Sequence, residues 1–598
     1  MRKAEGNTCL NTTGNGIVLT PRIVTSDDVP DDQQHLVGIW LNPTIDDVTF
    51  NNNVGGDDIV IEQNEVDGAG FTDSYSIAHF DGSDVFDDLT IQSNDFYDGG
   101  IFAGDDAYSS TGMLISGNLF DGASMNLSSQ FQNSLIDGNT FRNNGYTHMQ
   151  VGLKSSTISN NIFEPCGPSP HATYPSSAFM LWGSNYGLTP STDVTISGNT
   201  VHFNDFALPD ELSHGIRLLT DIDGTTIHIT DNEFIDGGMQ TGGFAVRNQG
   251  LNTADASGNW WGTNDGTVIG GLFDGSVDYT PWLDVGDDVG DPGFQGDFAE
   301  LWVDDDSPQT GTDGRIEEGI GLVTASTVNV LPGTYVEVGQ VVIDKDVTIL
   351  GDATSKPVVM TDSNTGSSGD ARAWWLVNAG KDLTMKNMVL DGAGYNVYQG
   401  IRAHGTGLVE DCDFRNIKFS QYVGMGIAFM DANWTVRRCT FEDIERLGVI
   451  AFGPGVTNAV LEWNTYTGKG VGDWLDYAFE FGNGAVGVAN YNTVTACQGV
   501  ASSDGSTSAG ILATTYYGPG TAVSLTGNVL TGNTTGVAIG YDGTDTTVLT
   551  ANYNNISGND SYGMSASGSG VSIDALHNWW GDVSGPLDNS DDTGTGGW

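Results

Sequence analysis

The feature that most constrains this chain is a short phrase, Val194-Thr-Ile-Ser-Gly-Asn-Thr-Val201, which recurs with small changes along nearly the whole length. Other copies occupy residues 89–96, 113–120, 134–141, 228–234 and 523–530. Such a period is typical of a solenoid, because one repeat cannot bury its apolar side without stacking on its neighbours. Aligned on the asparagine, the repeats fall at intervals mostly in the twenties of residues, at Asn64, Asn94, Asn118, Asn139, Asn161, Asn199, Asn232, Asn259, Asn387, Cys412, Cys439, Asn464, Asn492, Asn528, Asn554 and Asn578.

The residues around the asparagine favour strands over helices. Ile196 and Val201 are apolar and Ser197 is polar, which fits a period of two rather than 3.6. Glycine is abundant, with 84 of 598 residues, as tight turns between strands require. We therefore predict a parallel β-helix in which the asparagines stack at one corner, where their amides satisfy turn groups that the sheets cannot reach.

At this point the chain resembles the right-handed parallel β-helix superfamily, which includes pectate lyases, pectin esterases and many large surface proteins. The resemblance implies an all-β fold and no particular function. Ser257-Gly-Asn-Trp-Trp-Gly262, followed by Val277-Asp-Tyr-Thr-Pro-Trp-Leu283, resembles the closing signature of surface-protein β-helices. Residues 301–306, 315–320 and 327–337 resemble the opening of a second one: an acidic strand, a short capping helix and a first coil.

These signals divide the chain into two tandem right-handed β-helix domains. We expect domain 1 at residues 1–285, an acidic Gly-rich linker at 286–296, and domain 2, with its own N-terminal cap, at 297–598. Asn578-Trp-Trp-Gly581 repeats the closing phrase without its second element. Both ends therefore read as cut, and we expect a longer native chain.

The net charge is extreme, at −57 from 20 Lys and Arg against 77 Asp and Glu. Such a surface repels nucleic acid and anionic membranes and attracts cations, above all Ca²⁺, although it also serves simply to keep a protein soluble in salt. No run of about 18 apolar residues is present, so we expect no membrane insertion. No signal peptide is visible, and an extracellular or cell-surface location rests on fold and acidity alone. The expected calcium ligands are Asp304, Asp305, Asp306, Asp313 and Glu317.

Candidate catalytic residues are few. The basic residues of domain 2 suggest an anionic sugar, but most alternate in sign with acids one coil away, as in Glu410 and Arg437, which indicates pairing across strands. The catalytic phrases of pectate lyases, polygalacturonases, pectin esterases and mannuronan epimerases are not visible. The remaining candidates have no partner by this argument or lie in the long intervals of domain 1: Arg402, His404, Lys418, His214 and Arg217.

Three classes of function stay open. The first is a structural or adhesive surface protein, part of a larger or filament-forming chain, with other copies of itself or surface polysaccharide as partners. The second is a secreted lyase or hydrolase of acidic polysaccharides, which rests on fold analogy. The third is a non-catalytic glycan-binding module that uses exposed aromatic residues, for which the candidates are Trp182, Tyr186, Trp474, Tyr477, Tyr516 and Tyr517.

Two cysteines replace the asparagine in consecutive coils, at Cys412 and Cys439. Equivalent Cα atoms of stacked strands lie about 4.8 Å apart, which a disulfide tolerates. Parallel side chains in register rarely offer the required torsion, so we expect buried free thiols that act as small apolar fillers.

Overall fold

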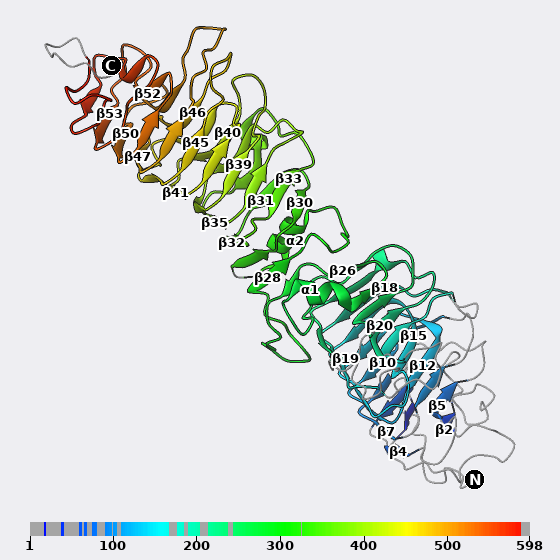
Figure 1. Cartoon of the computed structure of the whole chain (residues 1–598). Coiled ribbons are helices and arrows are strands. Elements are labelled where there is room, and N and C mark those ends of the chain that lie inside the picture. Colours follow the sequence, from blue (N-terminus) through cyan, green and yellow to red (C-terminus); the bar gives the residue numbers. More distant parts are fainter. Residues whose placement is uncertain are drawn as a thin grey trace. The chain divides into compact units, whose positions relative to one another are not determined.

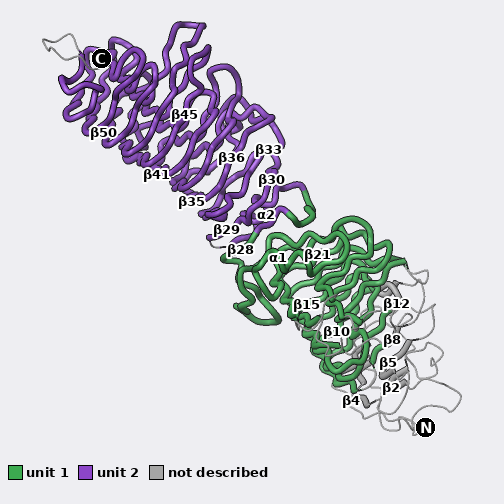
Figure 2. The backbone as a smooth tube through the Cα atoms, viewed as in Figure 1, with its two compact units in different colours: residues 1–302, 306–311 green, residues 303–305, 312–598 purple. Residues whose placement is uncertain are grey.

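The structure is a computed structural model with two compact units. It describes residues 17–19, 37–40, 59–62, 65–67, 75–79, 90–97, 100–103, 109–166, 176–184, 189–203, 213–236, 243–324 and 326–587. Unit 1 comprises residues 1–302 and 306–311, and unit 2 comprises residues 303–305 and 312–598 (Figure 2). The predicted copy at Asn64 lies outside the described residues.

Unit 1 is a stack of coils whose strands pair in parallel with those of the next coil (Figure 1). Its sheet 1 contains β1 (Ile17–Leu19), β3 (Ile59–Glu62), β6 (Thr90–Gln92), β10 (Leu114–Ser116), β13 (Leu135–Asp137), β18 (Thr192–Ser197), β21 (Ile227–Thr230), β24 (Ala254–Asp255) and β26 (Val277–Asp278). Sheet 2 contains β4 (Glu65–Asp67), β7 (Asp95–Tyr97), β11 (Leu119–Asp121), β14 (Thr140–Arg142), β16 (Ile162–Phe163), β19 (Thr200–Phe203) and β22 (Glu233–Asp236).

Sheet 3 of unit 1 runs beside sheet 1 and merges with it, because two long strands bend from one into the other. These are β12 (Met125–Gln132) and β15 (Met149–Ser159). The other members of sheet 3 are β2 (Val37–Trp40), β5 (Tyr75–His79), β8 (Ile101–Ala103), β17 (Ser176–Leu181), β20 (Ser213–Leu218), β23 (Val246–Asn248) and β25 (Phe273–Asp274), while β9 (Ser109–Thr111) pairs with the end of β12.

Unit 2 repeats the architecture with three separate parallel sheets. Sheet 1 contains β29 (Thr327–Val330), β32 (Val347–Gly351), β35 (Asp382–Lys386), β38 (Thr406–Glu410), β41 (Trp434–Arg437), β44 (Ala459–Glu462), β47 (Val486–Asn490), β50 (Ala522–Thr526), β53 (Val548–Asn552) and β55 (Ser572–Asp574). Sheet 2 contains β30 (Thr334–Glu337), β33 (Val358–Thr361), β36 (Val389–Asp391), β39 (Asp413–Arg415), β42 (Thr440–Glu442), β45 (Thr465–Thr467), β48 (Thr493–Thr495) and β51 (Val529–Thr531). Sheet 3 contains β31 (Val341–Ile343), β34 (Ala373–Val377), β37 (Gln399–Ala403), β40 (Met425–Met430), β43 (Leu447–Phe452), β46 (Tyr477–Gly482), β49 (Ala509–Thr514), β52 (Thr535–Ile539) and β54 (Tyr562–Ala566).

The predicted asparagine ladder is confirmed. Asn139 Nδ2 donates to Asn161 Oδ1 at 2.9 Å, and the Asn139 backbone N–H donates to the same oxygen at 2.9 Å. The same pair of bonds links each ladder asparagine to the next from Asn94 to Asn259 in unit 1 and from Asn464 to Asn578 in unit 2. A second, shorter ladder, which we did not predict, links Cys497, Asn533 and Asn559.

One ladder position was wrong. Asn387 has a φ of 57° and sits in the left-handed corner, one residue before the ladder. Lys386 pairs with Glu410 in register, so Met388 occupies the ladder position beside Cys412. Met388 is fully buried, so an apolar side chain fills the place of the amide in this coil. Lys386, Glu410 and Arg437 therefore form one column. With Asn387 on the ladder, Lys386 would instead stand beside Asp411, so the charged residues pair differently from the prediction.

Aromatic side chains two residues after the ladder fill the interior. In unit 1, Phe96, Phe120, Phe141 and Phe163 form a continuous stack with ring centroids 4.6–4.9 Å apart. Offset aromatic pairs contribute about 0.5–1.5 kcal/mol each beyond the area they bury. The phrase that recurs in the sequence thus places a polar ladder and an aromatic stack side by side along the axis.

The stretches around the predicted boundary are ordered pieces of the units. Residues 286–296, which we interpreted as a linker, lie against unit 1: the Gly296 N–H donates to Asp231 Oδ1 at 2.7 Å and the Phe294 N–H to the Gly198 carbonyl at 2.9 Å. In the closing region of unit 1, Trp261 stacks on Phe234. Other elements here are α1 (Gly266–Ile269) and the antiparallel strands β27 (Trp282–Leu283) and β28 (Glu300–Val303). The short 3-10 helices are η4 (Gly224–Thr226), η5 (Gly270–Leu272) and η6 (Gly369–Arg372).

The first coil of unit 2 is covered by the helix α2 (Arg315–Leu322). Ile316 and Ile320 are buried on its inner side. The carboxylate of Glu337, from β30, accepts hydrogen bonds from the backbone N–H groups of Ile316 and Glu317 at 3.1 and 3.0 Å. An acidic group at a helix N-terminus satisfies otherwise unpaired donors and complements the helix dipole.

Candidate functional site

The strongest candidate site lies on the outer face of sheet 3 in unit 2. Long connections precede β46 and β49, at residues 468–476 and 496–508, and cover this face. As a result every residue of β46 is buried, both those that point inward and those that point outward. The covered face holds an apolar cluster of Ala428, Leu447, Ile450, Leu475, Tyr477, Ala501, Ala509 and Leu512.

Glu480 interrupts this apolar face. In the outward column it stands between Ile450 on β43 and Leu512 on β49. Only 4% of its surface is exposed, and no described residue donates a hydrogen bond to its carboxylate. Burial raises the pKa of Glu480, and the positive charge of Arg446 opposes that rise only in part.

Arg446 is the second polar group of the face, and its side chain is half-buried. Its backbone precedes β43, where its carbonyl accepts the N–H of Tyr477 at 2.8 Å. Its Nε is buried and has no hydrogen-bond partner among the described residues. A buried donor or acceptor left without a partner costs about 1–3 kcal/mol. Glu480 and Arg446 therefore stand out from the hydrogen-bonded ladder groups elsewhere in the unit.

Tyrosine side chains form the rim of this face. The rings of Tyr516 and Tyr517 meet at 5.0 Å, those of Tyr516 and Tyr541 at 4.7 Å, and Phe452 lies 5.3 Å from Tyr517. Tyr516, Tyr517 and Tyr541 are each more than half exposed. Burial is the main cause that raises the pKa of Tyr517, and the nearby charge of Glu480 raises it further. We call Arg446, Glu480, Tyr516, Tyr517 and Tyr541 the tyrosine face.

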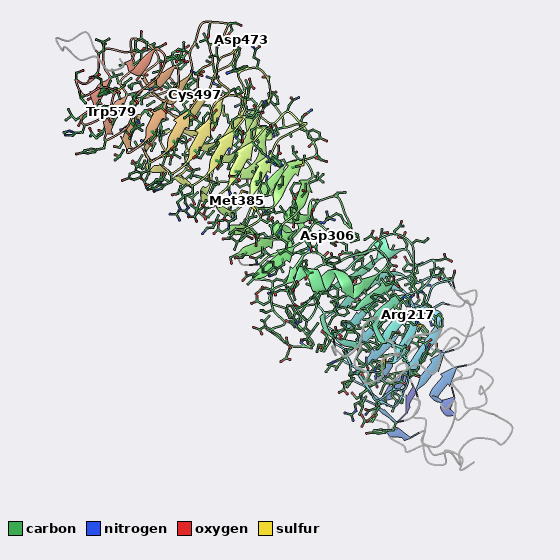
Figure 3. The ribbon with its side chains drawn as sticks, in the orientation of Figure 1. Arg217, Asp306, Met385, Asp473, Cys497 and Trp579 are labelled. Atoms are coloured by element: carbon green, nitrogen blue, oxygen red, sulfur yellow. The ribbon has the colours of Figure 1, made fainter. Side chains whose placement is uncertain are left out.

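The connection before β46 is held by its own contacts. Trp474 Nε1 donates to the Gly470 carbonyl at 3.0 Å, and the Lys469 ammonium lies 5.6 Å from the centre of the Trp474 ring. Asp473 (Figure 3) accepts hydrogen bonds from Tyr422 and Ser502, and these bonds hold its pKa at about 2. Tyr477 donates from its hydroxyl to the Thr507 carbonyl at 3.0 Å. Of the predicted aromatics, Tyr516 and Tyr517 thus belong to the tyrosine face, whereas Tyr477 and Trp474 pack in its wall.

In unit 1 the structure brings His214 and Arg217 together on β20 with Arg247 on β23 (Figure 3). Arg217 pairs in register with Arg247, and its Nη2 donates to Gln249 Oε1 at 3.1 Å. Arg247 forms an ion pair with Asp274 at 2.8 Å. Burial, followed by the charges of the two arginines, lowers the pKa of His214 to about 3, so the imidazole is neutral.

The predicted aromatics of unit 1 have a different outcome. Trp182 packs with Met180 and Leu219 in a small apolar cluster. Tyr186 lies outside the described residues.

Three residues that we took as unpaired in unit 2 have partners. Arg402 Nε and His404 Nε2 both contact Asp370 Oδ1, at 2.9 and 2.8 Å. Lys418 Nζ lies 2.6 Å from Asp443. The partners come from the connections and turns, whose paths the repeat does not fix. The interpretation of these residues as free cations was therefore wrong.

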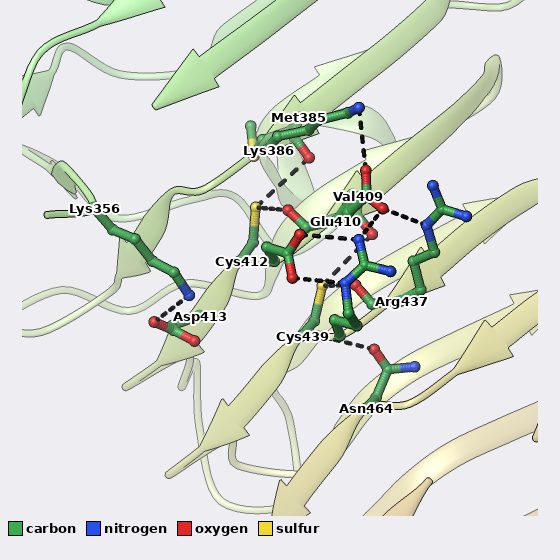
Figure 4. A network of polar contacts seen from close by, with 12 residues as sticks. Lys356, Met385, Lys386, Val409, Glu410, Cys412, Asp413, Arg437, Cys439 and Asn464 are labelled. Atoms are coloured by element: carbon green, nitrogen blue, oxygen red, sulfur yellow. Dashed lines mark hydrogen bonds and ion pairs between the residues drawn. The ribbon is translucent and has the colours of Figure 1, made fainter. Parts of the chain in front are cut away.

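A cluster of charges in unit 2 joins Lys386, Glu410 and Arg437 (Figure 4). Arg438 pairs with Glu410 and with Asp411 and extends the cluster. Burial alone would raise the pKa of Glu410, but hydrogen bonds from the three cations outweigh it and hold the pKa at about 2. The Glu410 carboxylate meets Arg437 at 2.6 Å and Lys386 at 3.1 Å. The charged side chains of this cluster pair with one another across neighbouring strands, as the alternating charges predict.

The expected calcium ligands have different contacts and different exposure in the structure. Asp305 Oδ2 accepts the backbone N–H of Thr334 at 2.6 Å, Asp304 is buried, and Asp313 is exposed. Glu317 lies in the first turn of α2. No group of three or more His, Cys, Asp and Glu side chains in the described ranges is placed to hold a metal ion. Calcium binding by Asp304, Asp305, Asp306, Asp313 and Glu317 stays a prediction.

Glu480 and Arg446 were missed in the sequence, although one signal was present. In the aligned strands of sheet 3 the outward position is Ala428, Ile450, Glu480 and Leu512 in successive coils. An acid with apolar neighbours on both sides in the column marks a position where burial and charge conflict. Reading that signal requires the register of sheet 3, which the asparagine phrase does not define.

No helix in the described ranges is long and apolar enough to cross a membrane. Residues 44–266 match the family model described as right handed beta helix region. No curated protein matches the chain. Among solved structures, the PL6 family alginate lyase AlyGC is 12% identical, with 94% of this chain and 95% of that chain covered and a TM-score of 0.33. A pectin methylesterase from carrot is 13% identical, with 46% and 87% covered and a TM-score of 0.27. The predicted fold is confirmed: the chain is an all-β, right-handed parallel β-helix protein.

Proposed function

We propose that the protein is an extracellular or cell-surface adhesive β-helix that binds a polysaccharide at the tyrosine face of unit 2. The observation that carries the proposal is the combination of the buried Glu480, the half-buried Arg446 whose Nε has no hydrogen-bond partner in the described ranges, and the exposed tyrosines. A binding site for a small ligand is usually an apolar surface with a few polar groups placed to orient the ligand. The tyrosine face has this composition.

Sugars suit these groups chemically. An aromatic ring packs on the C–H face of a sugar, while each hydroxyl both donates and accepts hydrogen bonds. One hydroxyl pair can therefore accept from Arg446 Nε and donate to the Glu480 carboxylate, which removes the cost of leaving both groups unpaired. The net charge of −57 repels acidic polymers over long range. We therefore expect neutral polysaccharides to bind better than acidic ones.

Affinity electrophoresis through gels that contain neutral or acidic polysaccharides tests this function. The double variant Tyr516→Ala/Tyr517→Ala should weaken binding about fivefold or more, since two stacked rings at about 0.5–1.5 kcal/mol each contribute about 1–3 kcal/mol. Tyr395→Ala is the matched control, because Tyr395 is an exposed tyrosine outside the tyrosine face. Unretarded migration of the wild type in every gel, or equal retardation of wild type and double variant, would refute the proposal.

A second candidate function, cleavage of the bound glycan, is favoured by one observation. Burial raises the pKa of the Glu480 carboxyl, and a raised pKa is the direction that suits a carboxyl group to general acid catalysis. Incubation with the bound polysaccharide, followed by assays for new reducing ends and for absorbance of unsaturated products, tests it. We expect Glu480→Gln to abolish any such activity. Activity that survives this substitution would exclude Glu480 as the acid.

A further inference from the structure

A second feature of unit 2 lies at the corner between sheets 1 and 2, one residue before the asparagine ladder. From Asn387 to His577 this residue has a positive φ in each coil. From Asn387 to Tyr491 its N–H donates to a carbonyl of the next coil, as Trp463 does to Asn490. From the coil of Arg438 onward the occupants of the corner are Arg438, Trp463, Tyr491, Gly527, Tyr553 and His577, with φ between 54° and 70°.

The equivalent corner of unit 1 shows what the backbone alone requires. Its described occupants are Ser93, Gly117, Gly138, Asn160, Gly198, Asp231 and Gly258. Glycine, asparagine and aspartate are the residues that tolerate this left-handed conformation, whereas bulky side chains adopt it rarely. Unit 2 therefore places bulky side chains where the backbone disfavours them. Strain that persists in a fold is a reason to look for a function at the strained residues.

The aromatic side chains at the corner are exposed, and they stack on one another in pairs. Trp463 and Tyr491 stack with ring centroids 4.4 Å apart, and Tyr553 and His577 stack at 5.3 Å. Tyr553 is 68% exposed and Trp463 is 57% exposed. Gly527 separates the two pairs, and a Cβ at Gly527 would lie 2.5 Å from the Tyr491 ring, so Tyr491 leans over this coil.

We propose that Trp463, Tyr491, Tyr553 and His577, which we call the corner stripe, bind a neutral polysaccharide strand that lies along the axis of unit 2. Coils repeat about every 4.8 Å, so the stripe presents aromatic groups at regular intervals over several coils. A polymer of repeating sugar units can contact many of them at once, and the separate contacts reinforce one another.

The charge of the chain selects this occupant over other polymers. Nucleic acid, an acidic polysaccharide and a second copy of the chain are all repelled by a net charge of −57. Hydroxyl-rich neutral chains carry no such penalty, and aromatic side chains bind them without charge. The corner stripe is separate from the tyrosine face, which lies on sheet 3. The inference rests on the proposed function only for the chemical class of the ligand.

The test combines binding with stability, because a merely structural stripe makes the opposite prediction. We substitute Trp463→Asn and Tyr553→Asn, since asparagine occupies this corner at Asn160 in unit 1. Relief of backbone strain should leave the thermal midpoint unchanged or raise it. Retardation by a soluble neutral β-glucan or galactomannan should fall about two- to tenfold in each variant, as expected for the loss of one stacked ring. Short oligosaccharides of the same sugars should bind as they do to the wild type, through the tyrosine face.

The outcomes separate the two proposals. Wild-type retardation of both variants by the long polymers, or a lowered thermal midpoint in both, would overturn the corner stripe and leave the tyrosine face intact. Tyr516→Ala/Tyr517→Ala should show the reverse pattern, with lost binding of oligosaccharides and residual binding of long polymers. If the wild type binds none of these polymers, the corner stripe is overturned as well.

Discussion

Replacing one ladder asparagine should destabilise unit 1 far more than replacing an exposed one. Asn199 is fully buried, and its Oδ1 accepts hydrogen bonds from the backbone N–H and the Nδ2 of Asn161, both at 2.9 Å. Its own Nδ2 donates to the Ile158 carbonyl at 3.0 Å and to Asn232 Oδ1 at 2.8 Å. Asn199→Ala therefore leaves the buried backbone N–H of Asn161 without an acceptor, whereas Asn161 Nδ2 still donates to the Ile136 and Ser159 carbonyls.

The expected cost follows from these groups. At about 1–3 kcal/mol for one buried donor left unpaired, the loss is about 1–3 kcal/mol of unfolding free energy. Water that enters the vacated space would bring the loss toward the lower value. Urea unfolding followed by circular dichroism measures it, with Asn464→Ala used to identify the transition of unit 2.

Asn160→Gly is the matched control. Asn160 occupies the corner with a φ of 56°, which glycine adopts freely, and its side chain makes a hydrogen bond to Asp137. We expect this variant to lose less than about 1 kcal/mol. An Asn199→Ala protein as stable as the Asn160→Gly protein would refute the assignment of the ladder as a main stabilising element.

Three further predictions follow from the buried titratable groups. Burial raises the pKa of Glu337 to about 7, above its usual value of 4.5, so protonation stabilises the fold; the contribution is complete below pH 4.5 and is lost as pH rises through about 7. Glu337→Gln should flatten the pH dependence of the thermal midpoint in this range, and an unchanged dependence would contradict the assignment. Burial raises the pKa of the Cys412 thiol to about 12 and that of Cys439 well above its usual value, so both should resist alkylation in the native protein and react in denaturant without reductant. A reaction that needs reductant would reveal a disulfide instead of the free thiols present in the structure. Glu410→Gln should destabilise unit 2 more than Lys386→Met, because it leaves Arg437 and Arg438 without a shared carboxylate; equal urea midpoints for the two variants would argue against this.

The fold could be predicted because one residue type does one physical task in most coils. Asn139 and Asn199 stand at a corner where the amide oxygen accepts from the previous coil and the amide nitrogen donates to the next coil. The error at Asn387 has the same origin, because the left-handed corner beside the ladder also favours asparagine. In this coil the ladder position holds Met388 and no asparagine, so from the sequence alone Asn387 and Met388 fit the ladder position equally well.

The candidate site was only partly predictable. Tyr516 and Tyr517 were visible as aromatic residues outside the repeat, and the structure places them on one face. Glu480 and Arg446 could not be identified as site residues from the sequence, because their burial depends on which connections cover sheet 3. The same reason explains Arg402 and Lys418: their partners, Asp370 and Asp443, lie outside the strands, where the period of the repeat gives no register.

The most direct test of the proposed function is a crystal structure of unit 2 within the full chain, soaked with an oligosaccharide of whichever polysaccharide retards the protein. We predict a sugar ring against Tyr516 or Tyr517, with hydroxyls within hydrogen-bonding distance of the Glu480 carboxylate and Arg446 Nε. A sugar bound with Glu480 and Arg446 still unpaired, or bound only away from the tyrosine face, would contradict the account.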